Sequence, residues 1–182
     1  MGFVACVQRA DRIVAQQGGC RVPAGVGRVL SVVEGAAERS MLWCGAAAAL
    51  AVFGGWRGRK AAAAGMAALA VAQVAANGLG KQLADRPRPP KEWFAHNKTN
   101  DRPDSSSFPS GHTAAAVAFT AAVIPSWPTA GIACAVPAAM VAVERVQSGA
   151  HYPSDVAAGA AVGLLTAHLI RRTPGLLLQH SL

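Results

Sequence analysis

The chain has 182 residues, of which 52% are hydrophobic and 5% aromatic, and its formal net charge is +8. This length fits one domain, predicted over residues 1–182, and the positive charge favours an anionic partner such as nucleic acid, anionic lipid or a phosphorylated substrate. No nucleic-acid partner is expected, because the lysines and arginines are scattered between apolar runs with few aromatic residues for stacking.

The first segment, residues 1–38, has the pattern of one or two short amphipathic helices. Its first part gathers apolar residues on one helical face, namely Phe3, Val4, Val7, Ala10, Ile13 and Val14. The pair Gly18-Gly19 breaks this run, and residues 24–33 form a second candidate helix. Such a segment either lies in the membrane surface or packs on the core of the same protein, and both interpretations stay open. Charged residues interrupt its apolar pattern, so no secretory signal is expected.

Five apolar runs follow, at residues 41–56, 61–80, 114–127, 130–143 and 156–170. Only the second reaches the roughly 20 residues that a helix needs to span a bilayer. Nearly every face of these runs is apolar, however, whereas a surface helix of a soluble protein shows a polar stripe. The sequence therefore predicts an all-α integral membrane bundle of about five to six helices, with residues 39–172 as its transmembrane part. A soluble alanine-rich bundle is the alternative.

Two further residue types bear on this prediction. The tryptophans lie at the ends of runs or in loops, as interfacial anchors do, at Trp43, Trp56, Trp93 and Trp127. The cysteines show no CxxC spacing and are expected to be buried free thiols, at Cys6, Cys20, Cys44 and Cys134. We therefore expect a multi-pass protein of the cell membrane, in contact with the lipid bilayer and without structural disulfides.

Three polar clusters lie at the ends of these runs. They contain Lys81 with Arg88, then Ser110, Gly111 and His112, and finally Arg145, His151 and Asp155. If each run crosses the bilayer once, the long loop at 81–112 and the connection at 144–155 share one membrane face. All three clusters then meet at the same end of the bundle.

The cations of these clusters indicate a phosphate site. Lys81, Arg88 and Arg145 would repel one another without a dianion between them, and arginine forks and a lysine charge suit phosphate. The Ser110 hydroxyl and the Gly111 backbone N–H, at the start of a helix, are able to complete the cradle. The less specific interpretations are interfacial cations for the first cluster and a plain helix cap for the second.

The remaining residues fit catalysis by two histidines. His151 with Asp155 has the pattern of a nucleophile and a carboxylate that orients it, although such a pair is more often a structural hydrogen bond. His112 is then the general acid for the departing alkoxide, and proton transfer of this kind is worth about 100- to 10,000-fold. No metal is expected, because three cations in one site disfavour a divalent ion. No partner pattern surrounds the other histidines, His96, His168 and His180.

This constellation resembles the type 2 phosphatidic acid phosphatase superfamily, which also includes the vanadium haloperoxidases. The family motifs Lys-x6-Arg-Pro, Pro-Ser-Gly-His and Ser-Arg-x5-His-x3-Asp are matched in order over roughly residues 40–170. The one visible departure is Glu144, which stands where the family has a serine and is expected to alter the hydrogen bonding near Arg145. The resemblance implies a membrane phosphatase without cofactor or metal that acts through a phosphohistidine on His151.

The resemblance also implies a membrane lipid phosphate as substrate. The small size and the amphipathic N-terminus are similar to those of small actinobacterial members, which act on polyprenyl-linked phosphates such as decaprenylphosphoryl-phosphoribose. Phosphatidic acid, phosphatidylglycerol phosphate and undecaprenyl diphosphate remain open as substrates. The alternatives from other classes are a vanadate-dependent haloperoxidase-like enzyme and a non-catalytic protein that binds phospholipid headgroups.

Overall fold

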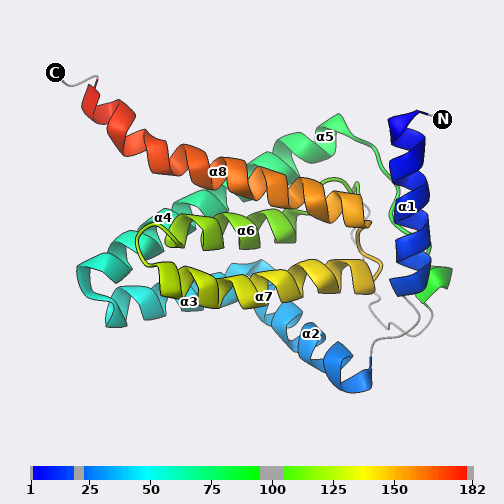
Figure 1. The fold of residues 1–182 in the computed structure, drawn as a ribbon, viewed down its shortest axis with the longest axis horizontal. Helices are drawn as coiled ribbons and strands as arrows, with labels where there is room; N and C mark the ends of the chain where they lie inside the picture. Colours follow the sequence, from blue (N-terminus) through cyan, green and yellow to red (C-terminus); the bar gives the residue numbers. More distant parts are fainter. Residues whose placement is uncertain (1, 19–22, 95–104, 180–182) are drawn as a thin grey trace.

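The computed structural model describes residues 2–18, 23–94 and 105–179, and this part of the chain contains helices and no strand. The longer helices are α1 (Phe3–Gly18), α2 (Ala24–Ala37), α3 (Met41–Phe53), α4 (Gly55–Gln73), α6 (Gly111–Val123), α7 (Pro128–Gln147) and α8 (Pro153–Gln179). Short helical segments join them: η1 (Glu38–Ser40), η2 (Val74–Gly80), α5 (Lys81–Leu83) and η3 (Lys91–Phe94). The prediction of an all-α helical bundle is confirmed (Figure 1).

Helix α6 lies at the centre of the bundle and packs against α4, α7 and α8. Glycines on the neighbouring helices allow this close approach, because a Cβ at Gly163 would lie 2.6 Å from the Ala114 carbonyl oxygen and one at Gly65 would lie 2.8 Å from the Phe119 ring. Small residues at the interface let helix backbones come close in the absence of a hydrophobic driving force in lipid. The alanine-rich composition therefore serves helix packing.

An aromatic pair anchors α3 to this centre. The Trp43 ring is 2% exposed and lies 5.3 Å, centroid to centroid, from the buried Phe119 ring of α6. The prediction that Trp43 is an interfacial anchor is therefore wrong. Trp56, at the turn between α3 and α4, is 80% exposed, as an anchor would be. The position of a tryptophan at the end of an apolar run does not by itself tell which side of the helix it occupies.

Among the residues that the structure describes, three helical stretches are long and apolar enough to cross a bilayer: Gly55–Gly80, Pro128–Gln147 and Pro153–Arg172. The expectation that only the second run reaches this length was wrong, because the helices of the fourth and fifth runs continue into flanking polar residues. Pro137 lies inside α7 without ending it. Helix α6 has 13 residues and is too short to be one of these spans. The chain is a multi-pass membrane protein.

The N-terminal helix α1 crosses the end of the bundle where α7 ends and α8 begins (Figure 1). It faces the protein with Asp11 and Ala15, which are 3% and 0% exposed, whereas Ile13 and Val14 are each 45% exposed. Helix α1 thus buries the carboxylate of Asp11, which is not on the predicted apolar face. Helix α2 packs against α7.

The cysteines differ from their predicted burial. Cys6 and Cys44 are exposed, and Cys134 is half-buried; all three are free thiols. The fourth, Cys20, lies outside the described residues. In a membrane bundle an apolar sequence context is compatible with exposure, because lipid accepts apolar side chains as readily as a protein core does.

Candidate active site

Contacts at one end of the bundle join the three polar clusters. The Arg88 Nη1 atom donates to the Ala150 carbonyl oxygen at 2.8 Å, which ties the first cluster to the connection between α7 and α8. The Ser110 backbone N–H donates to the Asp155 carbonyl oxygen at 3.0 Å, which ties the second cluster to the third. The three clusters therefore lie around one place, although they come from separate parts of the chain.

The start of α6 is built as a helix cap with little free space. The Ser110 side-chain oxygen accepts a hydrogen bond from the Thr113 backbone N–H at 3.4 Å, as an N-cap residue does. A Cβ at Gly111 would lie 2.4 Å from Asn77 Oδ1, and one at Gly159 of α8 would lie 2.4 Å from the Ser110 carbonyl oxygen. The position of Gly159 therefore requires glycine for the cap to keep its place, whereas a side chain at Gly111 would displace the Asn77 side chain.

Two of the three predicted cations share a loop residue. Lys81 Nζ donates to Ser105 Oγ at 3.0 Å, and Arg88 Nε donates to the Ser105 carbonyl oxygen at 3.2 Å. Burial and the nearby Arg88 charge lower the pKa of Lys81 from its ordinary value. Such mutual repulsion is relieved by an anion that binds both side chains.

The third cation, Arg145, is held by two carboxylates. Its Nε and Nη2 atoms donate to Glu144 Oε2 at 2.8 and 2.5 Å, and Nη2 also pairs with Glu34 of α2. The altered hydrogen bonding expected from Glu144 is therefore present. Glu34 was not predicted, because it lies 111 positions before Arg145 and no local pattern marks it. Two carboxylates thus occupy the fork of Arg145.

His151 is oriented by a backbone carbonyl. Its Nδ1 atom lies 2.6 Å from the Ser107 carbonyl oxygen, and it is 4.0 Å from Asp155 Oδ2. A carbonyl oxygen only accepts, so Nδ1 carries the hydrogen and Nε2 has the free lone pair. The interpretation of Asp155 as the direct hydrogen-bond partner of His151 therefore needs correction, and Ser107 is the partner that the sequence did not reveal.

Burial and the Arg88 charge lower the pKa of His151 to about 3, in spite of the hydrogen bond to Ser107 that raises it. The imidazole is therefore neutral at physiological pH, which is the form that a nucleophile needs. His112, in the first turn of α6, has its pKa lowered to about 4 by burial and by the charges of Arg145, Lys81 and Arg88. All three predicted cations therefore disfavour the protonated form of His112.

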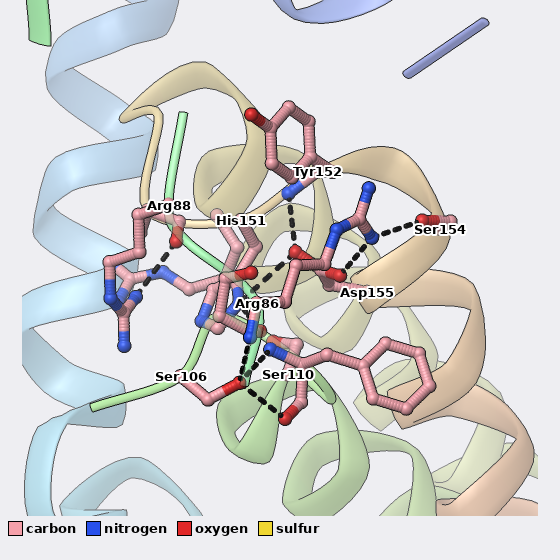
Figure 2. A network of polar contacts seen from close by, with 12 residues as sticks. Arg86, Arg88, Ser106, Ser110, His151, Tyr152, Ser154 and Asp155 are labelled. Atoms are coloured by element: carbon pink, nitrogen blue, oxygen red, sulfur yellow. Dashed lines mark hydrogen bonds and ion pairs between the residues drawn. The ribbon is translucent and has the colours of Figure 1, made fainter. Parts of the chain in front are cut away.

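The Asp155 carboxylate is held on both oxygens (Figure 2). Its Oδ2 accepts from the Tyr152 backbone N–H at 2.8 Å, and its Oδ1 accepts from Arg86 Nη1 at 2.5 Å. Asp155 is fully buried and lies in the first turn of α8, where a carboxylate is favourable. Arg86 was not among the predicted site residues, although it stands two positions before Arg88.

Two cavities adjoin this region. One, of about 450 Å³, has almost entirely apolar walls from α6, α7 and α8, and it reaches from Thr113 and Pro153 to Leu164. The other, of about 390 Å³, is polar and includes Arg86, Arg88 and Ser105 in its wall. The described residues thus place an apolar space and a polar space on different sides of the same cluster.

Within the described part of the chain, no group of three or more His, Cys, Asp or Glu side chains is arranged to hold a metal ion. His168 is exposed on α8, far along the helix from its first turn. His96 and His180 lie outside the described residues.

Three comparisons place this chain among known proteins. The family model described as PAP2 superfamily matches residues 61–177. The lipid A 1-phosphatases of Rhizobium johnstonii and Rhizobium etli are each 48% identical to this chain over 73 residues, which cover 36% of this chain and 29% and 30% of the two relatives. The match thus spans less than a third of either relative. The crystal structure of a transmembrane PAP2-type phosphatidylglycerolphosphate phosphatase from Bacillus subtilis has a TM-score of 0.70 at 22% identity, covering 93% of this chain and 87% of that one.

Proposed function

The chain belongs to the PAP2 superfamily, and from this premise we propose that it hydrolyses the phosphate of a membrane lipid without a metal, through a phosphohistidine intermediate. One observation carries the proposal: the His151 Nδ1–H donates to the Ser107 carbonyl oxygen at 2.6 Å, which leaves Nε2 as a neutral nucleophile. Burial, together with the charges of Arg145, Lys81 and Arg88, lowers the pKa of His112, the proposed acid, to about 4. A cluster of cations beside two histidines is suited to a phosphate ester.

In the first step His151 Nε2 attacks the phosphorus atom, an N–P bond forms and the bond from phosphorus to the lipid oxygen breaks. His112 gives its proton to the departing oxygen. Part of the lowering of the His112 pKa comes from the charges of Arg145, Lys81 and Arg88. A bound phosphate dianion offsets the charges of Lys81, Arg88 and Arg145, so the proton of His112 is held more firmly when substrate is present. The substrate thereby prepares its own general acid.

In the second step water attacks the phosphorus atom and the N–P bond breaks. His112, which is neutral after the first step, takes a proton from this water. The electron pair of the N–P bond returns to Nε2 of His151, and inorganic phosphate leaves. The Ser110 hydroxyl and the Gly111 N–H are proposed donors to the phosphoryl oxygens in both steps. Lys81, Arg88 and Arg145 offset the charge that develops there.

A lipid substrate is supported by the apolar cavity of about 450 Å³. This cavity begins at Thr113, whose hydroxyl lies 3.0 Å from that of Ser110, and it continues along α6 between α7 and α8. Its walls suit a hydrocarbon chain beside the proposed phosphate site. Within the lipid class we propose a polyprenyl-linked phosphate, such as decaprenylphosphoryl-phosphoribose. Phosphatidic acid, phosphatidylglycerol phosphate and undecaprenyl diphosphate are the alternatives.

The test is phosphate release by the purified protein in detergent, with a chelator present. The panel contains a polyprenyl phosphate sugar, a polyprenyl diphosphate, phosphatidic acid and phosphatidylglycerol phosphate. Each lipid is tested with the wild type, with His151→Ala, and with His168→Ala as a matched control on an exposed histidine. We expect release from the polyprenyl phosphate sugar, lost in His151→Ala and kept in His168→Ala.

Other outcomes assign the protein differently. Release from the polyprenyl diphosphate alone favours the undecaprenyl diphosphate alternative, and release from phosphatidic acid or phosphatidylglycerol phosphate alone overturns the polyprenyl proposal and keeps the phosphatase. Binding of lipid phosphates with no turnover favours a headgroup-binding protein, and bromide or chloride oxidation with added vanadate favours a haloperoxidase-like enzyme. Full phosphate release by His151→Ala refutes the phosphohistidine mechanism.

A further inference from the structure

Arg86 contacts both groups that face the Nδ1 side of His151. Its Nη1 atom donates to Asp155 Oδ1 at 2.5 Å, and the other oxygen of that carboxylate is 4.0 Å from His151 Nδ1. Its backbone carbonyl accepts from the Ser107 N–H at 2.9 Å, and the Ser107 carbonyl in turn accepts from His151 Nδ1. One residue therefore fixes the hydrogen-bond partner of His151 and the carboxylate next to it.

Arg86 is itself held by the N-terminal helix. Its Nη2 atom pairs with Asp11 Oδ2 of α1 at 2.7 Å, and the Asp11 carboxylate also accepts from the Ser154 N–H at 2.9 Å and from the Ser154 hydroxyl at 2.6 Å. The Asp11 side chain is 4% exposed. The Arg86 guanidinium also lies 4.3 Å from the centre of the Tyr152 ring. The Arg86 Nη1 atom also donates to the Ser154 hydroxyl at 2.7 Å, so the donors of Arg86 are directed to two carboxylates and a hydroxyl.

This arrangement separates Arg86 from Lys81 and Arg88. Lys81 and Arg88 donate to a hydroxyl and to backbone carbonyls, which a phosphate is able to replace. The half-buried Arg86 between two buried carboxylates is held much more firmly, since removing it leaves those buried charges uncompensated. Arg86 is therefore fixed in place, and its anchor Asp11 lies outside residues 61–177 that match the family.

We propose that Arg86, fixed by Asp11 of α1, is a positioning residue that holds Ser107 and Asp155 in the arrangement His151 needs for attack. This inference rests on the proposed function. Helix α1 is then part of the active site, although none of its residues contacts the reacting phosphate. The site is complete when α1 is docked across the end of the bundle.

The test uses the full chain and the lipid phosphate that the wild type hydrolyses. The variants are Arg86→Gln, Arg86→Lys, Asp11→Asn and the double variant Asp11→Asn/Arg86→Gln. Two matched controls remove the same charges from exposed positions, Arg59→Gln and Glu38→Gln. For each protein kcat, KM, the inhibition constant of inorganic phosphate and the thermal midpoint in detergent are measured.

Arg86→Gln is expected to lower kcat by about 10- to 100-fold, the usual effect of losing hydrogen bonds to a charged group. The inhibition constant of inorganic phosphate should stay unchanged, because Arg86 does not hold the phosphate. Asp11→Asn should give a smaller loss of kcat, and Arg86→Lys should recover part of the activity. The double variant should be no slower than Arg86→Gln, because Asp11 acts through Arg86. Both controls should keep the wild-type kcat.

Several results overturn the inference. Wild-type kcat in folded Arg86→Gln refutes the positioning role, and a weaker affinity for inorganic phosphate makes Arg86 a phosphate ligand instead. A double variant whose loss is the product of the two single losses shows that Asp11 acts independently. If Arg86→Gln does not fold, the isosteric Asp11→Asn decides by its kcat. If the wild type is active and His151→Ala is not, any of these results refutes only the positioning role of Arg86 and leaves the proposed function intact. An inactive wild type refutes both the positioning role and the proposed function.

Discussion

Gly159 and Gly163 offer a sharp test of how helix packing sets the site. The two glycines lie one turn apart on α8 and face α6. A Cβ at Gly159 would lie 2.4 Å from the Ser110 carbonyl oxygen, and one at Gly163 would lie 2.6 Å from the Ala114 carbonyl oxygen. Both substitutions to alanine therefore create a similar overlap with backbone, but only the first overlap is at the cap that carries Ser110 and His112.

The magnitude follows from these distances. Ordinary contact begins at 3.4 Å, so Gly159→Ala requires α6 and α8 to separate by about 1 Å (3.4 less 2.4) near the cap. Overpacking costs about 1–3 kcal/mol, and the gain in helix propensity from glycine to alanine offsets about 1 kcal/mol of it. A misplacement of about 1 Å at a reacting centre costs about 100-fold in rate. Activity should thus respond far more strongly than stability.

The assay compares the two variants at matched stability. We expect Gly159→Ala and Gly163→Ala to lower the thermal midpoint in detergent by similar amounts, and Gly159→Ala to lose about 100-fold in kcat while Gly163→Ala loses much less. Equal rates in the two variants, or wild-type activity in Gly159→Ala, would refute the reasoning that the Ser110–Gly159 contact sets the geometry of the site.

Three further predictions concern charge, pH and the core. Glu34→Gln removes one of the two carboxylates that compete with phosphate for the Arg145 guanidinium. The inhibition constant of inorganic phosphate should therefore fall by up to about fivefold, since such an ion pair is worth up to about 1 kcal/mol. An unchanged constant would contradict this. The His151 pKa of about 3 means that the folded state binds fewer protons than the unfolded state between pH 3 and 6.5, so stability falls as pH drops through this window. When the pH is lowered from 7 to 5, the free energy of unfolding of His151→Gln should therefore fall by about 2 kcal/mol less than that of the wild type. Thermal midpoints in detergent measure this difference, and equal losses in the two proteins would exclude the linkage. Phe119→Ala removes the partner of Trp43 and should destabilise by about 3–5 kcal/mol, read from the same midpoints; a shift no larger than that of a surface variant would contradict the described core.

The sequence predicted the elements that depend on local pattern. The apolar runs correspond to α3, α4, α6, α7 and α8, and Ser110 caps α6 as its type and position indicated. The spacing from Arg145 to His151 and Asp155 placed these residues at the connection between α7 and α8. These features depend on hydrophobic periodicity and helix capping, which involve only a few neighbouring residues and can therefore be recognised from a single sequence.

The features that the sequence did not reveal arise from contacts between distant segments. Asp11 meets Arg86 across 75 positions, and Ser107 meets His151 across 44. Glu34 reaches Arg145 because α2 packs on α7, an arrangement with no local signature. The length of α7 was underestimated for another reason, since polar residues at its end continue the helix beyond the apolar run.

The most direct measurement of the central claim is the site of covalent phosphorylation during turnover. The protein is mixed with its lipid substrate, the reaction is stopped by denaturation at alkaline pH, and the phosphorylated residue and ring atom are identified by mass spectrometry and phosphorus NMR. The account predicts phosphate on Nε2 of His151, because Nδ1 donates to the Ser107 carbonyl oxygen at 2.6 Å. Phosphate on Nδ1 of His151 or on another residue would contradict it.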